Sequence, residues 1–205
     1  MPGSRPEDLL AFLAERRTVR IYRDTPVSPD LVRRLLEAAT AAPSAHNAQA
    51  WRFVVIERDA VKQRLADRMA DRWRRDLERS GVDPKAIEVQ LRFSIRRFST
   101  APLLILACYT MKEMDAYPDR ARRAAERTMA VQTVAVAIQN LMLAAAAYGL
   151  GSCWVCAPLF CPGLVRRALR LPADWEPQAL VTVGYPAHTP PVPPRKALQD
   201  VVITR

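Results

Sequence analysis

Apolar residues recur along this chain in two different patterns, which predict helices and strands in alternation. A spacing of three to four residues is typical of helices, and a short continuous apolar run is typical of a buried strand. The helical pattern covers residues 7–15, 29–42, 60–98 with a break near 81–84, 120–148 and 162–171. Short apolar runs cover residues 51–56, 103–108, 152–155 and 179–183. Together these segments predict a single domain over residues 1–205.

Residues with special backbone preferences mark the ends of several predicted helices. Ser28 followed by Pro29 is typical of an N-cap with proline at the first helical position. Pro43 ends that helix and opens a polar loop, and Gly149 is suited to the C-cap of the long helix. The first helix is expected to turn its apolar side chains inward, namely Leu9, Leu10, Phe12 and Leu13.

Two segments differ in composition from the rest of the domain. Residues of about 60–98 carry many arginines and few large apolar side chains, so we expect a helical lid over a site. The five prolines between Pro186 and Pro194 hold the chain extended. We therefore expect residues of about 186–205 to form an arm that reaches a neighbouring subunit, with an edge strand near 198–203.

The longest apolar run, Val131–Leu150, is the one candidate for a membrane span in the sequence. Polar residues such as Gln132 and Asn140 interrupt it, so we interpret it as a buried core helix with no membrane partner. Near the N-terminus we find no order of residues typical of a secretory signal, which favours a cytoplasmic location.

The charge balance favours anionic small-molecule ligands. Lys and Arg number 31 against 21 Asp and Glu, which gives a formal net charge of +10. The arginines are scattered and lack interleaved aromatic residues, so we expect no nucleic-acid partner.

The cysteines do not form a metal-binding pattern. Cys153 and Cys156 have the C-x-x-C spacing, but there is no second such pair, and His46 and His188 lack ligand spacing to these sulfurs. We therefore expect all four cysteines to be buried apolar residues and predict no metal site.

The segment Arg16-Arg17-Thr18-Val19-Arg20 is suited to binding a phosphate. Arginine offers forked donors that match phosphate oxygens, and the Thr18 hydroxyl adds another. In an extended strand Thr18 and Arg20 point to one face while Val19 points to the core. The alternative is a solvated basic end of the preceding helix, where cations are favoured in any case.

Taken together, four motifs resemble the nitroreductase family of FMN-dependent oxidoreductases. They are Arg-Arg-Thr-x-Arg from residue 16, Ala-Pro-Ser-x-x-Asn-x-Gln-x-Trp from residue 42, the strand end Gly149–Ala157, and Gly-Tyr-Pro from residue 184 with a downstream arginine. The resemblance implies an α+β fold with three α/β/α layers and a central mixed sheet. It also implies an intertwined homodimer with FMN at the interface.

The same resemblance implies a set of cofactor-binding residues. The phosphate and ribityl chain would be held by Arg16, Arg17, Thr18, Val19, Arg20, Arg195 and Lys196. The opposite subunit would line the flavin with Pro43, Ser44, Ala45 and Asn47. The backbone of Val155, Cys156 and Ala157 would face the ring near its reactive nitrogen. The redox chemistry belongs to the flavin, so no catalytic side chain is expected.

Further segments resemble the nitroreductase-like C-terminal domain of the deazaflavin coenzyme F(420) glutamate ligase. They are Ala125–Met129, Gly151–Val155, Phe160-Cys161 and Leu171–Trp175. This resemblance implies FMN-dependent reduction of a dehydro precursor of that coenzyme, with Ser44, His46 and Asp76 as candidate substrate contacts. For His46 the alternative is a surface or packing role, and for Asp76 it is a local ion pair on a solvated helix.

Three functions therefore remain open. The first is transfer of reducing equivalents from a reduced nicotinamide, NAD(P)H, or from a reduced flavin, to an organic acceptor. The second is the deazaflavin reaction, with a deazaflavin as substrate or ligand. The third is storage of a flavin or deazaflavin without turnover.

Overall fold

The computed structural model describes residues 5–205. Its helices and strands follow the sequence prediction with shifts of a few residues at their ends. The helices are α1 (Pro6–Glu15), α2 (Pro29–Thr40), α3 (Asp59–Arg79), α4 (Pro84–Ser99), α5 (Arg120–Ala147) and α6 (Pro162–Leu169). The strands are β1 (Trp51–Ile56), β2 (Leu103–Tyr109), β3 (Gly151–Val155) and β4 (Glu176–Gly184).

The four strands form one sheet in the order β1-β2-β4-β3, with β3 at an edge. All three strand pairs are antiparallel. In the part of the chain that the structure describes, the parallel pairing expected of a mixed sheet is limited to an isolated bridge between Thr18 and Ser152. The segment that follows α1 therefore runs beside the free edge of β3.

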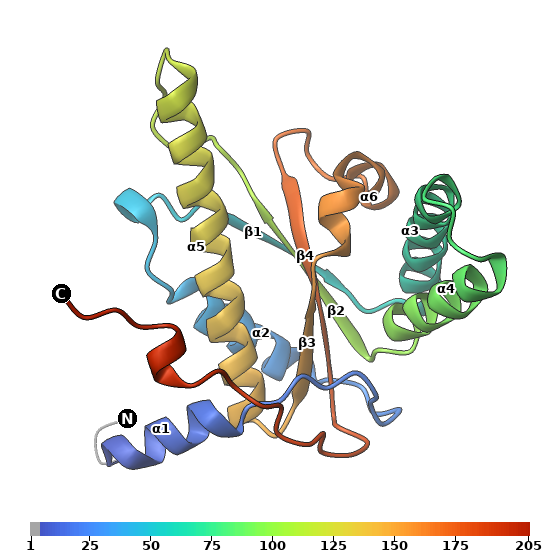
Figure 1. Cartoon of the computed structure of the whole chain (residues 1–205), viewed down its shortest axis with the longest axis horizontal. Coiled ribbons are helices and arrows are strands. Elements are labelled where there is room, and N and C mark those ends of the chain that lie inside the picture. The colour runs from blue at the N-terminus through green and yellow to red at the C-terminus, as the bar shows by residue number, and fades with distance from the viewer. Residues whose placement is uncertain (1–4) are drawn as a thin grey trace.

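The sheet is buried on both faces, which gives the predicted three layers. Alternate residues of β2 such as Ile105 pack into a core formed with α2 and α5. Their neighbours, such as Leu104 and Leu106, pack into a second core with α3, α4 and α6. Figure 1 shows α5 and α2 on one side of the strands and α3, α4 and α6 on the other. The prediction of an α/β/α fold is confirmed.

The caps of α5 fix where β3 begins. Asp119 caps the N-terminus, since its side chain accepts a hydrogen bond of 2.9 Å from the Arg122 amide. At the other end Gly149 has a φ of +71°. The Leu150 amide reaches back to the Ala145 carbonyl at 2.8 Å. This is a Schellman motif, and it turns the chain directly into β3.

Helix α5 is a core helix despite its apolar composition. It is long and apolar enough to cross a membrane, with a mean hydropathy of 1.6 over an 18-residue stretch, but core helices of soluble proteins share these properties. Nine of its residues, among them Ile138 and Leu141, are buried. Their burial against α2 and the sheet agrees with the sequence interpretation.

Two expectations about peripheral segments are wrong for the single protomer. Helix α1 buries none of its residues, and Leu9 and Leu10 are exposed. Residues Leu198–Asp200 form a 3-10 turn in place of the predicted edge strand. The α3–α4 hairpin, the predicted lid, is joined to the main core at its base, where Phe98 is almost completely buried.

Candidate functional site

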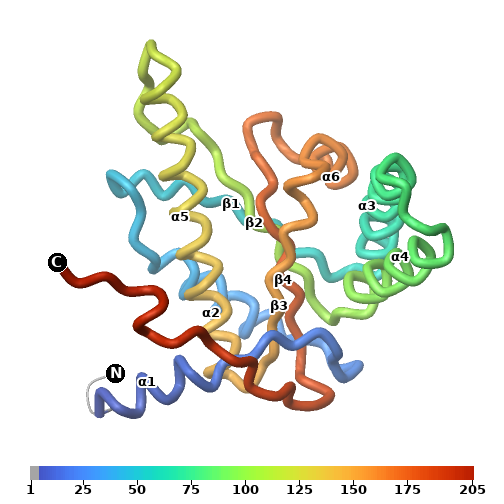
Figure 2. Tube along the Cα trace, viewed as in Figure 1, coloured from blue at the N-terminus to red at the C-terminus, as the bar shows by residue number. Residues whose placement is uncertain are grey.

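A cavity of about 260 Å³ opens where α1, the end of α5, the start of β3 and the C-terminal arm meet. Figure 2 shows the N-terminal segment and the C-terminal arm running past the same end of α5. The cavity is lined by Phe12, Glu15, Arg16, Arg17, Val19, Ala146, Gly149, Leu150, Gly151, Ser152, Pro186, Thr189 and Pro190. The cavity thus includes Arg16, Arg17 and Val19 of the predicted phosphate-binding segment, whereas Thr18 is not among its lining residues.

Arg16 and Arg17 have different roles at this cavity. The Arg17 guanidinium folds back onto the end of α1 and donates to the Ala14 carbonyl at 2.6 Å and the Arg16 carbonyl at 3.0 Å. It therefore fulfils the alternative of a basic helix end. Arg16 Nη1 is buried and has no hydrogen-bond partner among the residues that the structure describes. Such a donor needs an acceptor, so Arg16 fits an anion in the cavity.

Val19 fixes the segment against the sheet as predicted. Its side chain is buried, and its amide donates to the Ser152 carbonyl at 2.9 Å. The contact depends on Gly151, since a Cβ atom there would lie 2.6 Å from the Cβ of Val19. Sequence reasoning had placed Gly151 only within a motif. Its role as the point of closest approach is a tertiary property.

Tyr22 joins the 16–20 segment to β4, a role that the sequence did not suggest. Its buried hydroxyl lies 2.6 Å from the Val19 carbonyl and 2.6 Å from the Thr182 hydroxyl. Burial is the main cause that raises the pKa of Tyr22 above its ordinary value. The phenol therefore remains a neutral donor throughout the physiological pH range.

The Tyr22→Phe variant is expected to lower the free energy of unfolding by about 1–2 kcal/mol, because the Val19 carbonyl loses its donor and the Thr182 hydroxyl loses its partner. Urea unfolding followed by circular dichroism measures this loss. Tyr148→Phe is the control, since the Tyr148 side chain is exposed. Equal stability of the two variants would contradict the role given to Tyr22.

The predicted ring-facing residues follow at the far end of β3. Val155 ends the strand, Cys156 is exposed, and Ala157 begins a 3-10 turn, Ala157–Phe160. Four residue steps along a strand span about 13 Å, so β3 connects the cavity with this exposed end. The site residues 16–19 and 155–157 thus lie along one sheet edge.

The cysteines are buried as expected except at this position. Cys108, Cys153 and Cys161 are buried, and desolvation raises the pKa of each thiol, that of Cys108 to about 12. Cys156 is exposed, which corrects the prediction that all four are buried. It follows the end of the edge strand β3, where the sheet no longer covers it.

The loop of Pro43, Ser44, Ala45 and Asn47 lies elsewhere on the protomer. The Ala45 amide lies 3.4 Å from the Thr133 hydroxyl in the middle of α5, whereas the cavity touches Ala146. Thirteen residues of helix separate these two points by about 20 Å. One protomer therefore does not bring the loop to its own cavity.

Several other predicted residues stay outside the cavity. Arg195 and Lys196 are exposed and make no hydrogen bond or ion pair within residues 5–205. Asp76 lies on α3 and pairs with Arg72 at 3.3 Å, as the local alternative expected. Arg20 is exposed and is not part of the cavity lining.

Comparisons with known proteins agree with this arrangement of motifs on the fold. Residues 13–185 match the sequence model of the Nitroreductase family. The chain belongs to the nitroreductase family. This membership confirms the family resemblance and the predicted class of enzyme, an FMN-dependent oxidoreductase.

Individual relatives cover nearly the whole of this nitroreductase-family chain. A 5,6-dimethylbenzimidazole synthase of Rhodospirillum rubrum is 32% identical and aligns with 91% of this chain and 86% of its own length. An NADH dehydrogenase of Thermus thermophilus is 33% identical, with 93% of each chain covered. A Desulfovibrio desulfuricans structure, described as a nitroreductase in complex with FMN, is 25% identical with a TM-score of 0.74, covering 99% of this chain and 98% of its own.

Proposed function

We propose that this nitroreductase-family enzyme binds FMN along β3 and passes reducing equivalents from NAD(P)H to an organic acceptor. The buried and unpartnered Arg16 Nη1 in the cavity is the observation that carries the proposal. A phosphate dianion supplies the acceptor that this guanidinium lacks. The Thermus thermophilus relative, named an NADH dehydrogenase, supports a reduced nicotinamide as the donor.

In this proposal each part of the edge of β3 has one task. Arg16 and the Thr18 hydroxyl hold the phosphate, while Arg17, whose guanidinium caps α1, and Arg20 extend the same basic segment. The backbone at Val155–Ala157 orients the ring, and bound FMN supplies the transfer of electrons. Cys156 places an exposed thiol beside the ring in this proposal.

We further propose that the enzyme is a homodimer in which the 43–49 loop of one protomer lines the flavin of the other. The separation of about 20 Å along α5 within one protomer supports this arrangement. Apolar side chains left exposed on α1 and on the arm supply a surface for the partner, including Leu9, Leu10, Val192, Leu198, Val201 and Ile203. In the dimer, Arg195 and Lys196 of the arm are free to join a phosphate site.

The second candidate is reduction of a dehydro precursor of a deazaflavin coenzyme. Three of the four segments that resemble the F(420) ligase domain share one core beside the predicted ring end, through Val155, Cys161, Leu171 and Trp175. The fourth segment, Ala125–Met129, lies on α5 and packs on the other face of the sheet. Asp174, within the segment Leu171–Trp175, is fixed by the Thr110 hydroxyl at 2.9 Å. In this second candidate the α3–α4 hairpin acts as a lid that brings Asp76 to the deazaflavin precursor. For either candidate we propose a cytoplasmic location.

The test is a set of assays on one purified, FMN-loaded preparation. We expect NADH or NADPH to bleach the yellow protein in the absence of air, and a nitroaromatic compound or quinone to restore the colour. A preparation that stays colourless after incubation with FMN would overturn the proposal, and FMN binding without any turnover would favour the storage function.

Two further acceptors distinguish the candidate functions. Selective, tight binding and reduction of a dehydro-deazaflavin would favour the second candidate over a general reductase. The name of the Rhodospirillum rubrum relative adds an assay for 5,6-dimethylbenzimidazole in air. Formation of that product would replace both candidates.

A further inference from the structure

A second group of ligating side chains lies outside the cavity, where the 43–49 loop meets α5. One ligand atom each of His46, Asp115 and Glu126 lies within 4.8 Å of the other two. In the part of the chain that the structure describes, this is the one such group of three or more His, Cys, Asp or Glu side chains. The three residues come from three separate segments, so their spacing in the sequence does not reveal them.

Glu126 is a buried carboxylate with few partners. Its side chain is 3% exposed. One oxygen, Oε2, accepts a hydrogen bond of 3.2 Å from the Asp115 amide. The other, Oε1, accepts none from the described residues and lies 3.7 Å from His46 Nε2. A charged carboxylate removed from water requires a cation or several donors.

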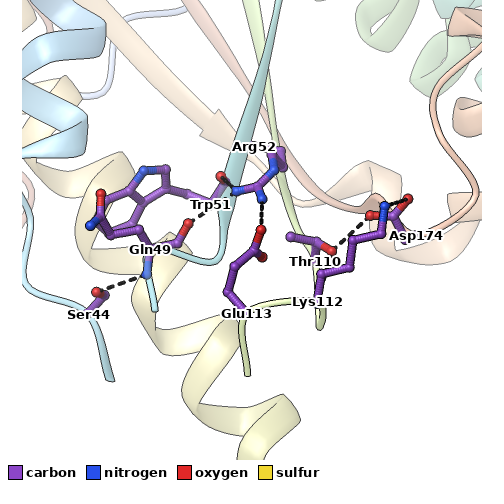
Figure 3. A network of polar contacts seen from close by, with 8 residues as sticks. All are labelled: Ser44, Gln49, Trp51, Arg52, Thr110, Lys112, Glu113 and Asp174. Atoms are coloured by element: carbon purple, nitrogen blue, oxygen red, sulfur yellow. Dashed lines mark hydrogen bonds and ion pairs between the residues drawn. The ribbon is translucent and has the colours of Figure 1, made fainter. Parts of the chain in front are cut away.

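Basic side chains of α5, of β1 and of the segment after β2 pair with groups other than Glu126. Arg127, the next residue on α5, donates to the Tyr109 hydroxyl at 2.7 Å. Figure 3 shows Arg52 of β1 paired with Glu113, and Lys112, which follows β2, paired with Asp174. In a chain with a net charge of +10, no Lys or Arg of the described residues forms an ion pair with Glu126.

The separation of His46 from Glu126 suits a metal ion between them. At 3.7 Å the two atoms are too far apart for a hydrogen bond. Bonds from zinc to imidazole nitrogen and carboxylate oxygen are about 2.0–2.2 Å, so two ligands at a tetrahedral angle lie about 3.4 Å apart, close to this separation. Asp115 has an exposed side chain, and one of its carboxylate oxygens lies within 4.8 Å of both other ligand atoms, so it supplies the third ligand.

We propose that His46, Asp115 and Glu126 form a binding site for a divalent transition-metal cation such as Zn²⁺ or Ni²⁺. One imidazole and two carboxylates suit these metals, and a fourth position is left for water. The cation supplies the positive charge that buried Glu126 lacks. It also ties the 43–49 loop to α5 at His46, which has a φ of +53°.

Neither the arginine cavity nor the edge of β3 contributes a ligand, and His46 is the one ligand in the loop that we propose lines the partner's flavin, so metal binding is measured apart from redox activity. The test is a titration of the FMN-loaded protein, first treated with a chelator and dialysed, with Zn²⁺ and then with Ni²⁺ by calorimetry. We expect saturation at one equivalent per chain, accompanied by a rise in the melting temperature.

The variants identify the ligands. His46→Ala and Glu126→Gln are each expected to weaken the affinity for Zn²⁺ tenfold or more, since loss even of an outer ligand partner costs about tenfold to hundredfold. His188→Ala is the matched control, because His188 is the one other histidine of the chain and is exposed. Its affinity for Zn²⁺ is expected to equal that of the wild type.

Two results would overturn the proposal. One is the absence of saturable binding near one equivalent in the wild type. The other is wild-type affinity in both His46→Ala and Glu126→Gln, which would place the metal elsewhere, for example on the exposed Cys156. Because His46 is half exposed, its variant keeps the test decisive even where Glu126→Gln does not fold.

Discussion

The Arg16→Ala variant is expected to bind FMN about tenfold to hundredfold more weakly than the wild type, with riboflavin affinity almost unchanged. A hydrogen bond to a charged group contributes about 1.5–3 kcal/mol, and about 1.4 kcal/mol corresponds to a factor of ten. FMN carries the phosphate that would accept from Arg16 Nη1, whereas riboflavin carries none. Fluorescence titration of the FMN-free protein with both flavins measures the two affinities.

The same variant makes a prediction about the protein without cofactor. Arg16 Nη1 is buried without a partner, so its removal is expected to leave the free energy of unfolding of the FMN-free protein unchanged or higher. Arg17→Ala is the matched comparison, since the Arg17 guanidinium already donates to two carbonyls at the end of α1. We expect this variant to lose stability and to lose less FMN affinity than Arg16→Ala.

The assignment of Arg16 to the phosphate fails if FMN and riboflavin weaken by the same factor. It also fails if Arg17→Ala loses more FMN affinity than Arg16→Ala. In that case the guanidinium of Arg17 would have to leave the Ala14 carbonyl on binding, and the basic segment would serve the phosphate through a different residue.

Replacing Gly151 by valine is expected to abolish FMN binding and to lower the free energy of unfolding by about 1–3 kcal/mol. Even the first carbon of the new side chain would lie 2.6 Å from the Cβ of Val19. Relief of that overlap requires the 16–20 segment to move away from β3, because both Cβ atoms are bonded directly to the backbone and cannot rotate away. The move would separate Arg16 from the cavity.

Two variants test whether the overlap with Val19 is the cause. Gly163→Ala is the matched control, since a Cβ there meets only the flexible ends of Arg167 at 3.4 Å and Arg166 at 4.0 Å, and alanine suits a helix better than glycine. The double variant Gly151→Ala, Val19→Gly adds a Cβ on β3 and removes the Val19 side chain that this Cβ would overlap. We expect it to regain part of the FMN binding that Gly151→Ala alone loses, and no recovery would contradict the steric explanation.

Local signals predicted much of the fold. The N-cap at Ser28 is present, with its hydroxyl accepting from the Leu31 amide at 3.3 Å. The continuous apolar run of β2 is buried along its whole length. The break near 81–84 separates two helices, α3 and α4. These features depend on neighbours in the sequence, so a pattern of a few residues is enough to predict them.

Predictions that depended on distant contacts succeeded less well. The apolar residues of α1, such as Leu10, were expected inside and are exposed, because burial of an amphipathic helix depends on which surface meets it. Cys156 lies in an apolar stretch of sequence, as the three buried cysteines do, but it follows the end of an edge strand. A pattern of apolar residues does not say which strand lies at an edge.

By itself, the sequence determined the secondary structure, the nitroreductase family and the basic segment that begins at Arg16, because periodicity, caps and motifs are local properties of the chain. Only the tertiary structure decided that Arg17 caps α1 while Arg16 is left without a partner, and that Val19 requires a glycine at position 151. It also decided that His46 and Glu126, which are 80 residues apart in the sequence, lie 3.7 Å from each other. Such pairings depend on how layers pack, and the direction of a side chain is fixed only when its neighbours are in place.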